Sequence, residues 1–144
     1  MKFFYFLVIG GMMIFSCGAK QPETLGIHNG RLTDCPGRPN CVSSQASGQE
    51  SIVAPFQYQG GRQMAFKRLK KAAASLKRTK IVTETDNYLH IECKSAIMGF
   101  VDDLEFYFPK EKIIHVRSAS RLGYSDFNVN RKRIERLRKL FAEK

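Results

Sequence analysis

The stretch DCPGRPNCVSSQ, Asp34–Gln45, brings together the side chains that three kinds of chemistry require. Cys35 and Cys41 are six positions apart, and prolines and a glycine between them favour a tight reversal that brings the two thiols close. Such a pair can form a disulfide or bind a metal. The next hydroxyl and amide side chains suit hydrogen bonding to a ligand or a place in an active site. They are Ser43, Ser44 and Gln45.

A zinc site needs more ligands than this loop supplies. Structural zinc is usually held by two closely spaced ligand pairs, whereas the remaining histidines, His28, His90 and His115, are scattered along the chain. We therefore predict no metal site and no cofactor. Whether the two thiols are oxidised depends on the compartment.

A second cluster of polar side chains lies in SRLGYSDFNVNRKR, residues 120–133, around a glycine turn and a predicted helix start. Helix N-termini attract anions through their free amide groups, and an arginine can grip a carboxylate or phosphate with two hydrogen bonds. The alternative is a structural role, with helix capping and an Asp126–arginine pair. The candidate ligand-binding residues here are Arg121, Tyr124, Asp126, Asn130 and Arg131.

A catalytic alternative uses the same residue types. A hydrolase could combine Ser43 or Ser44 with His115 or Asp126, although no glycine-flanked nucleophile motif surrounds either serine. Asp102 and Asp103 are adjacent in a predicted strand, so their carboxylates should point to opposite faces and meet different basic partners. We therefore assign no catalytic residue.

The N-terminus predicts export. One basic residue, Lys2, precedes an uncharged run that is shorter than a membrane span and ends at a cysteine, as in a signal peptide. The ending IFSCG resembles a bacterial lipobox, which implies cleavage after residue 16 and lipid on the sulfur and amino group of Cys17. The alternative is an ordinary secretory signal with Cys17 incidental. Because no aspartate follows Cys17, an outer-membrane location facing the periplasm is favoured.

Export decides how the cysteines are expected to pair. Disulfides persist outside the cytosol, so Cys35 and Cys41 are expected to bond each other. A ring this small stabilises the fold by only about 2 kcal/mol, so it mainly stiffens a loop. Cys93 is in phase with apolar residues of a predicted strand and is expected to be a buried, inert thiol.

The elements that must position these residues follow from hydrophobic periodicity. Apolar residues at helical spacing predict amphipathic helices over residues 62–77 and near the C-terminus. Between them lie four runs typical of strands, TKIVTET, YLHIECKS, DDLEFYF and KIIHVRSAS, and SIVAPFQY can add an edge strand. The order helix, four strands, helix predicts an α+β fold with an antiparallel sheet of four to five strands and both helices on one face.

The chain is expected to contain one domain. We assign residues 1–16 to the signal peptide, 17–33 to the lipidated cysteine and a tether, and 34–144 to the domain. Lys2 is the one basic residue of the signal, so removal of the signal leaves a formal excess of about ten positive charges. Such a charge favours anionic lipid or an envelope protein as partner, and export argues against nucleic acid.

Three phrases that occur in order, CPGRPNCVSSQA, ESIVAPFQY and SRLGYSDFNVNRKRIERLR, carry a family resemblance over roughly residues 33–142. With YLHIECKSAIMGFVDDLEFYF between them, they resemble the domain of unknown function 1499 (DUF1499) family of exported, often lipid-anchored bacterial proteins with plastid relatives. At Phe127 and Asn128 that family more often has an aliphatic residue and a glycine. The resemblance implies no particular activity. We expect an envelope lipoprotein that is a non-catalytic binding or structural module for an anionic ligand, lipid or partner protein, with the hydrolase as the alternative.

Overall fold

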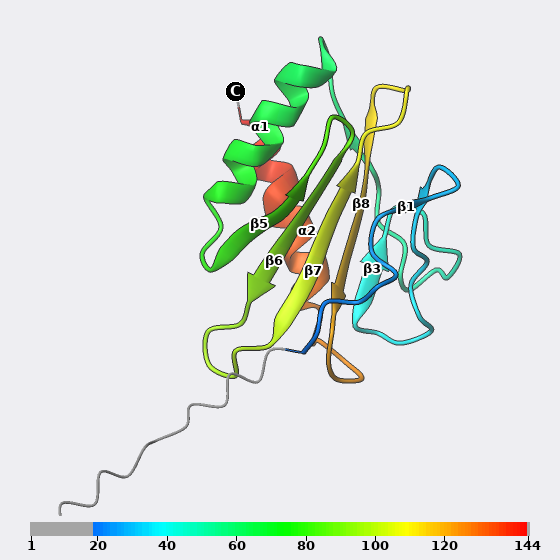
Figure 1. Cartoon of the computed structure of the whole chain (residues 1–144), viewed down its shortest axis with the longest axis vertical. Coiled ribbons are helices and arrows are strands. Elements are labelled where there is room, and N and C mark those ends of the chain that lie inside the picture. The colour runs from blue at the N-terminus through cyan, green and yellow to red at the C-terminus, as the bar shows by residue number, and fades with distance from the viewer. Residues whose placement is uncertain (1–18, 144) are drawn as a thin grey trace, which may run out of the picture.

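The computed structural model describes residues 19–143, which form two helices packed on one face of an antiparallel sheet (Figure 1). The α+β class and the two-helix layer are as the sequence predicts. The predicted signal peptide and Cys17 lie outside the described residues. Within residues 19–143, neither helix is long and apolar enough to cross a membrane.

Ten elements follow one another along the chain. The four strands before the first helix are short: β1 (Ile27–His28), β2 (Arg31–Leu32), β3 (Cys41–Ser43) and β4 (Phe56–Gln57). The remaining elements are α1 (Arg62–Ala74), β5 (Thr79–Glu84), β6 (Tyr88–Lys94), β7 (Val101–Tyr107), β8 (Ile113–Ser120) and α2 (Val129–Ala142).

The main sheet has six strands, so the prediction of four to five strands and of the order helix, four strands, helix was wrong. The strands run β3-β8-β7-β6-β5, and β4 pairs with β8. Both β3 and β4 precede α1, pairing with the C-terminal and N-terminal halves of β8 respectively. Two or three residues are too few to show the alternation by which a strand is recognised, and all three residues of β3 are buried.

The apolar core lies between the sheet and the helices. Alternate residues of β6, β7 and β8 point toward the helices, and Ile91 faces Leu104 across the register. Phe56 of β4 makes edge-to-face contacts with Phe106 of β7 and Phe141 of α2, which joins three elements at one point. The core therefore forms at the helix-covered face of the sheet.

The first helix ends three residues before its predicted end. Ser75 donates its hydroxyl to the Ala72 carbonyl, and Arg78 adopts a left-handed conformation, with φ of 57°, that turns the chain into β5. Leu76 still reaches the core from this turn. The spacing of apolar residues indicates which side chains are buried, and it continues beyond the last residue that makes helical hydrogen bonds. The predicted helix was therefore too long.

Asp126, which precedes the second helix, supplies the side-chain hydrogen bonds at its start. The Asp126 carboxylate accepts hydrogen bonds from the backbone amides of Asn128 and Asn130. Asn128 occupies the N-cap position in a left-handed conformation, with φ of 65°, and its side chain makes no capping bond. Glycine and asparagine tolerate this conformation best.

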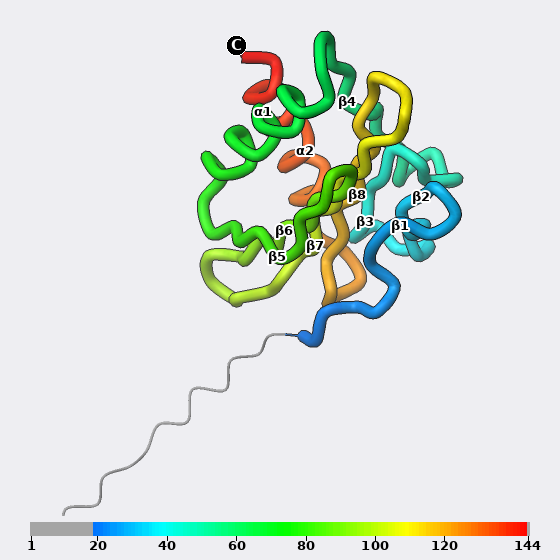
Figure 2. Tube along the Cα trace, turned by 45° about the horizontal axis from the view of Figure 1, so that its top comes forward, coloured from blue at the N-terminus to red at the C-terminus, as the bar shows by residue number. Residues whose placement is uncertain are grey.

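The segment 19–36, most of which we assigned to a tether, lies against the sheet face opposite the helices (Figure 2). It forms the β1–β2 hairpin, in which Ile27 pairs with Leu32. The amide of Gly26 donates to Glu105 of β7, and Arg121 donates to the carbonyl of Ala19. This segment covers the polar face of the sheet at β7 and β8, whereas β5 stays exposed.

Candidate functional site

The loop after β2 contains the disulfide that the sequence predicts. Cys35 and Cys41 are bonded, with their Cα atoms 5.6 Å apart. Cys41 begins β3 and pairs with Ala119 of β8, so the bond ties the N-terminal segment to the edge of the sheet. The disulfide is thus confirmed, and neither sulfur is available as a nucleophile or metal ligand.

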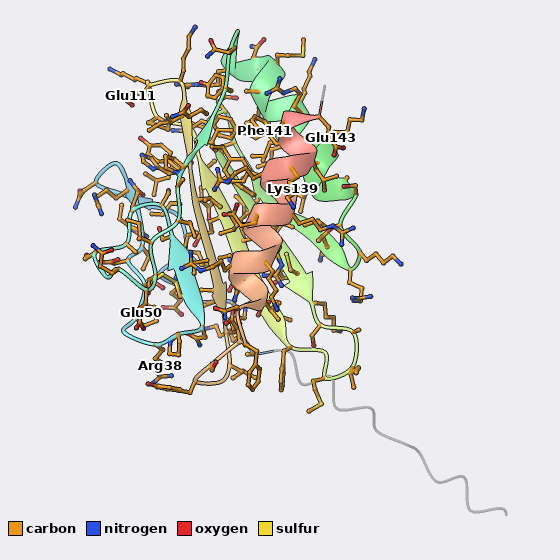
Figure 3. The ribbon with its side chains drawn as sticks, turned by 180° about the vertical axis from the view of Figure 1, so that it is seen from behind. Arg38, Glu50, Glu111, Lys139, Phe141 and Glu143 are labelled. Carbon is orange, nitrogen blue, oxygen red and sulfur yellow. A yellow bond between two sulfur atoms is a disulfide. The ribbon has the colours of Figure 1, made fainter. Side chains whose placement is uncertain are left out.

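The disulfide loop and the turn before α2 meet around one cavity of about 580 Å³, which we call the disulfide-loop pocket. Its charged lining residues are Arg38, Arg131, Glu50 and Asp126, so positive and negative charges balance. Figure 3 labels Arg38 and Glu50, which extend from two neighbouring loops on the same side of the molecule. The pocket therefore has no electrostatic preference for an anion.

The predicted site residues Tyr124, Asp126 and Arg131 all line this pocket. Arg131 donates to the carbonyls of Glu50 and Ile52, at 2.6 and 3.0 Å, and so fastens the loop before β4. The Asp126 carboxylate is occupied by the start of α2, whereas the Tyr124 ring is exposed. Of the three, Tyr124 has the side chain most accessible to a ligand.

Asn130 lies in a buried hydrogen-bond network beneath the turn. Its side chain accepts from Ser118 and donates to Asp126, Ser120 and the Asn40 carbonyl. This network joins the first turn of α2 to β8. Because Asn130 is fully buried, its role in the described structure is to position α2.

Arg121 is bound on the opposite face of the sheet. Its guanidinium donates to both carboxylate oxygens of Asp103, at 2.7 and 2.9 Å, and to Glu92 at 2.6 Å. These bonds raise its pKa, with the hydrogen bond to Asp103 as the largest cause. With the Ala19 carbonyl as a further partner, Arg121 stabilises the fold and holds the N-terminal segment.

Asp102 and Asp103 meet different partners on opposite faces, as their alternation predicts. Asp102 accepts from Arg133 of α2 at 2.6 Å, while Asp103 binds His90 and Arg121. Burial opposes ionisation of Asp103, yet the hydrogen bonds from Arg121 and His90 outweigh it and lower its pKa. The carboxylate is therefore held ionised.

Glu105 is the centre of a second buried group that we did not identify from the sequence. Its carboxylate accepts from the Tyr88 hydroxyl, the Arg117 guanidinium and the Gly26 amide, each at 2.8 to 2.9 Å. Burial, and then the charge of Glu105, raise the pKa of Tyr88. In sequence these residues read only as the polar face of a half-exposed sheet, because nothing indicated that residues 19–36 would cover it.

The serine cluster lies where β3 ends. Ser43 is buried and its hydroxyl accepts from the Gln45 amide, while the Gln45 side chain accepts from Leu32 of β2. Ser44 Oγ lies 3.1 Å from His115 Nδ1 and also accepts the amide of Val116. Ser44 and His115 thus come together, whereas Asp126 is engaged at the start of α2.

Burial favours the neutral forms of His115 and Cys93. Burial, followed by the nearby charge of Arg31, lowers the pKa of His115 and keeps the imidazole neutral. Burial raises the pKa of the Cys93 thiol to about 11, so the thiolate is scarce at neutral pH. Within residues 19–143, no group of three or more histidine, cysteine and acidic side chains could hold a metal ion.

A further depression of about 320 Å³ lies between the end of α1, the start of β5 and the first turns of α2. We call it the basic groove, because five of its nine lining residues are basic and none is acidic. The basic residues are Lys77, Arg78, Lys132, Arg133 and Arg136. Arg133 is paired with Asp102, and no ion pair neutralises the other four within the described residues. The five basic residues come from the α1–β5 turn and from α2, so their convergence depends on the packing of segments far apart in the sequence.

The chain belongs to the DUF1499 family: the family model described as "Protein of unknown function (DUF1499)" matches residues 31–141. The match includes the disulfide loop and both helices, and starts within the β1–β2 hairpin. No curated protein and no solved structure matched the chain.

Proposed function

We propose that this member of the DUF1499 family is a lipid-anchored module of the bacterial envelope that binds an anionic ligand without catalysing a reaction. The observation that carries the proposal is the basic groove, where four cations without an acidic partner surround one depression. A phosphate or carboxylate placed there would meet several positive charges at once. The balanced charges of the disulfide-loop pocket offer no such attraction.

The position of Lys132 supports a role in binding. It lies in the first turn of α2, which contains no acidic residue, and the positive end of the helix dipole disfavours a cation there. Its neighbours Arg131 and Arg133 both have partners in the fold, but the Lys132 side chain is exposed and makes no hydrogen bond or ion pair within the described part of the chain. Ligand binding would explain a charge that the helix itself does not favour.

Binding of a soluble polyanion tests the proposal. We expect a form that begins at Gly18 to bind tripolyphosphate in calorimetry at low ionic strength, with affinity falling as salt rises. The double variant K132E/R136E should reduce the affinity by about tenfold or more, because it turns two attractive charges into repulsive ones. The matched control is K110E/K112E, which changes the net charge equally in the β7–β8 loop.

Two outcomes would contradict the groove as the site. If K110E/K112E weakened binding as much as K132E/R136E, only the net charge of the protein would matter. If the unmodified protein did not bind the polyanion at low salt, the anion-binding function itself would be rejected.

A second candidate is the hydrolase, which the contact between Ser44 and His115 favours. The serine hydroxyl lies at hydrogen-bond distance from an imidazole whose pKa burial lowers, which favours the neutral ring that could accept the serine proton. Within the described residues, no carboxylate is hydrogen-bonded to that imidazole. Labelling by a fluorophosphonate probe, lost in Ser44→Ala, would support this candidate; an unlabelled protein would reject it.

A further inference from the structure

We infer that one end of the domain, formed by the β6–β7 loop and the β8–α2 loop, docks on the bilayer surface with apolar side chains inserted. We call this end, residues 95–100 and 121–129, the apolar loop end. The inference depends on observations other than those of the basic groove. It also extends the proposed function, because docking of this end would bring the basic groove to anionic lipid headgroups.

The first observation is the exposure of large apolar side chains on both loops. Ile97 is 93% exposed, Phe127 is 84% exposed and Met98 is 64% exposed. Single exposed apolar residues are common, but a group on neighbouring loops indicates an interaction surface. The other exposed apolar side chains of this end are Phe100, Leu122, Tyr124 and Val129.

The two loops are neighbours because the strands that carry them are paired. Lys94 of β6 faces Val101 of β7, and Asp102 faces Ser120 of β8. Beyond the strand ends, the amide of Arg121 donates to the carbonyl of Val101 at 3.1 Å. Figure 1 shows both loops at the same end of the sheet. Their apolar side chains therefore project from one end of the molecule.

The described chain also begins at this end, which identifies the occupant. Arg121, at the base of the β8–α2 loop, holds the carbonyl of Ala19 at 3.0 Å. The preceding part of the chain contains the uncharged run Phe3–Ser16 and Cys17, so either a lipidated Cys17 or an uncleaved apolar segment would join the domain here. A hydrocarbon attachment two residues from Ala19 leaves the apolar loop end close to the bilayer.

The conformation of Phe127 is consistent with this role. It has φ of 53°, a left-handed conformation that is unfavourable for a bulky residue, and it directs its ring to solvent. The core gains nothing from that ring. Strained residues with exposed aromatic rings are expected where the side chain has a partner outside the fold.

Basic residues border the apolar loop end. The basic groove adjoins the apolar loop end, since Val129 lines the groove and Lys94 follows its lining residue Cys93. Two exposed acidic residues, Glu111 and Glu143, appear at the opposite end of the molecule in Figure 3, whereas the exposed Glu50 lines the disulfide-loop pocket together with Tyr124. Cations beside inserted apolar side chains are typical of proteins that lie on anionic bilayers.

Tryptophan substitution tests the inference, because the chain contains no tryptophan. The elements and the core that the structure describes draw on residues 27–142 alone, so we expect a form that begins at Gly18 to retain this fold. We expect Ile97→Trp and Phe127→Trp to show blue-shifted fluorescence with neutral phosphatidylcholine vesicles. The matched control is Met64→Trp, which is 63% exposed but close to Arg62, whose side chain bonds Pro109 in the β7–β8 loop at the opposite end.

Substitution by serine gives the strength of the interaction. Ile97→Ser and Phe127→Ser should each weaken partitioning to neutral vesicles by about tenfold, the effect of losing one large buried apolar side chain. The inference is overturned if neither tryptophan shifts, or if Met64→Trp shifts equally. It is also overturned if Ile97→Trp is already blue-shifted without vesicles in a concentration-dependent dimer, which would make a second copy the occupant.

The proposed function and this inference fail separately. Neutral vesicles carry no net charge that could attract the basic groove. The apolar loop end of the K132E/R136E variant should therefore insert into them as it does in the unmodified protein. If the unmodified protein inserted into neutral vesicles but did not bind tripolyphosphate, only the proposed anion-binding function would be rejected. Polyanion binding without insertion would reject the membrane-docking end alone.

Discussion

At the scale of single residues, Asp103 shows how this protein tolerates charge in its interior. Its two carboxylate oxygens receive hydrogen bonds from His90 and Arg121, and its side chain is almost completely buried. A buried charge is stable only when it is paired and hydrogen-bonded. The same ion pair holds Arg121, and through it the N-terminal segment at Ala19.

We predict that Asp103→Asn lowers the free energy of unfolding by about 3 kcal/mol, because it leaves Arg121 with only Glu92 as a charged partner. Urea denaturation at neutral pH measures the loss. Asp86→Asn in the exposed β5–β6 turn is the control and should change stability by less than about 0.5 kcal/mol. Equal stability of both variants would contradict the role assigned to Asp103.

The pH dependence has a definite sign. The pKa of Asp103 is lowered in the folded protein, so its stabilising contribution is complete above the pKa of the unfolded state, about 4. The contribution is lost as pH falls through the lower pKa of the folded state. The stability difference between the unmodified protein and Asp103→Asn should therefore shrink below about pH 4.

At the scale of elements, a substitution in the first turn of α2 should change stability and polyanion binding in opposite directions. We predict that Lys132→Glu raises the free energy of unfolding by about 0.3 to 1 kcal/mol, because it places a carboxylate at the positive end of the helix. The same substitution should weaken tripolyphosphate binding. Thermal unfolding and calorimetry on one sample measure both effects, and Lys139→Glu near the end of α2 is the control.

A combined loss of stability and binding in Lys132→Glu would contradict this account, since it would mean that Lys132 supports the fold. Lys139→Glu should instead destabilise α2 slightly, because it removes a cation from the negative end of the helix dipole. It should leave polyanion affinity nearly unchanged.

The features that the sequence predicted correctly are those indicated by residues close together in the chain. The composition of β7 predicted a strand, and because adjacent residues of a strand point to opposite faces, Asp102 and Asp103 were correctly expected to meet different partners. The disulfide followed from a short spacing and an expected compartment. These features depend on neighbours within a few residues of one another.

Contacts over long chain separations could not be predicted. The Gly26 amide bonds Glu105, which is 79 residues away, and Arg121 bonds Ala19, which is 102 residues away. Such contacts turn residues that resemble ligand-binding groups into parts of the fold. Convergence of Lys77 and Lys132 on one groove likewise depends on how α1, β5 and α2 pack.

At the scale of the whole molecule, the two proposed surfaces act through different forces. The basic groove attracts headgroup charge, which salt screens. The apolar loop end gains free energy from burial of apolar surface, which screening does not weaken. Residues that share no contact and act through different forces should contribute independently.

We therefore predict additivity on vesicles that contain phosphatidylglycerol. At low salt, K132E/R136E and I97S/F127S should each weaken binding, and the logarithms of their effects should sum in the quadruple variant. At high salt, the groove variant should bind like the unmodified protein while the loop variant remains weak. Cosedimentation over a salt series measures all four proteins, and K110E/K112E serves as the charge control. If K132E/R136E weakened binding equally at low and high salt, the substitutions would act by disturbing the apolar loop end and not by removing attraction to the headgroups.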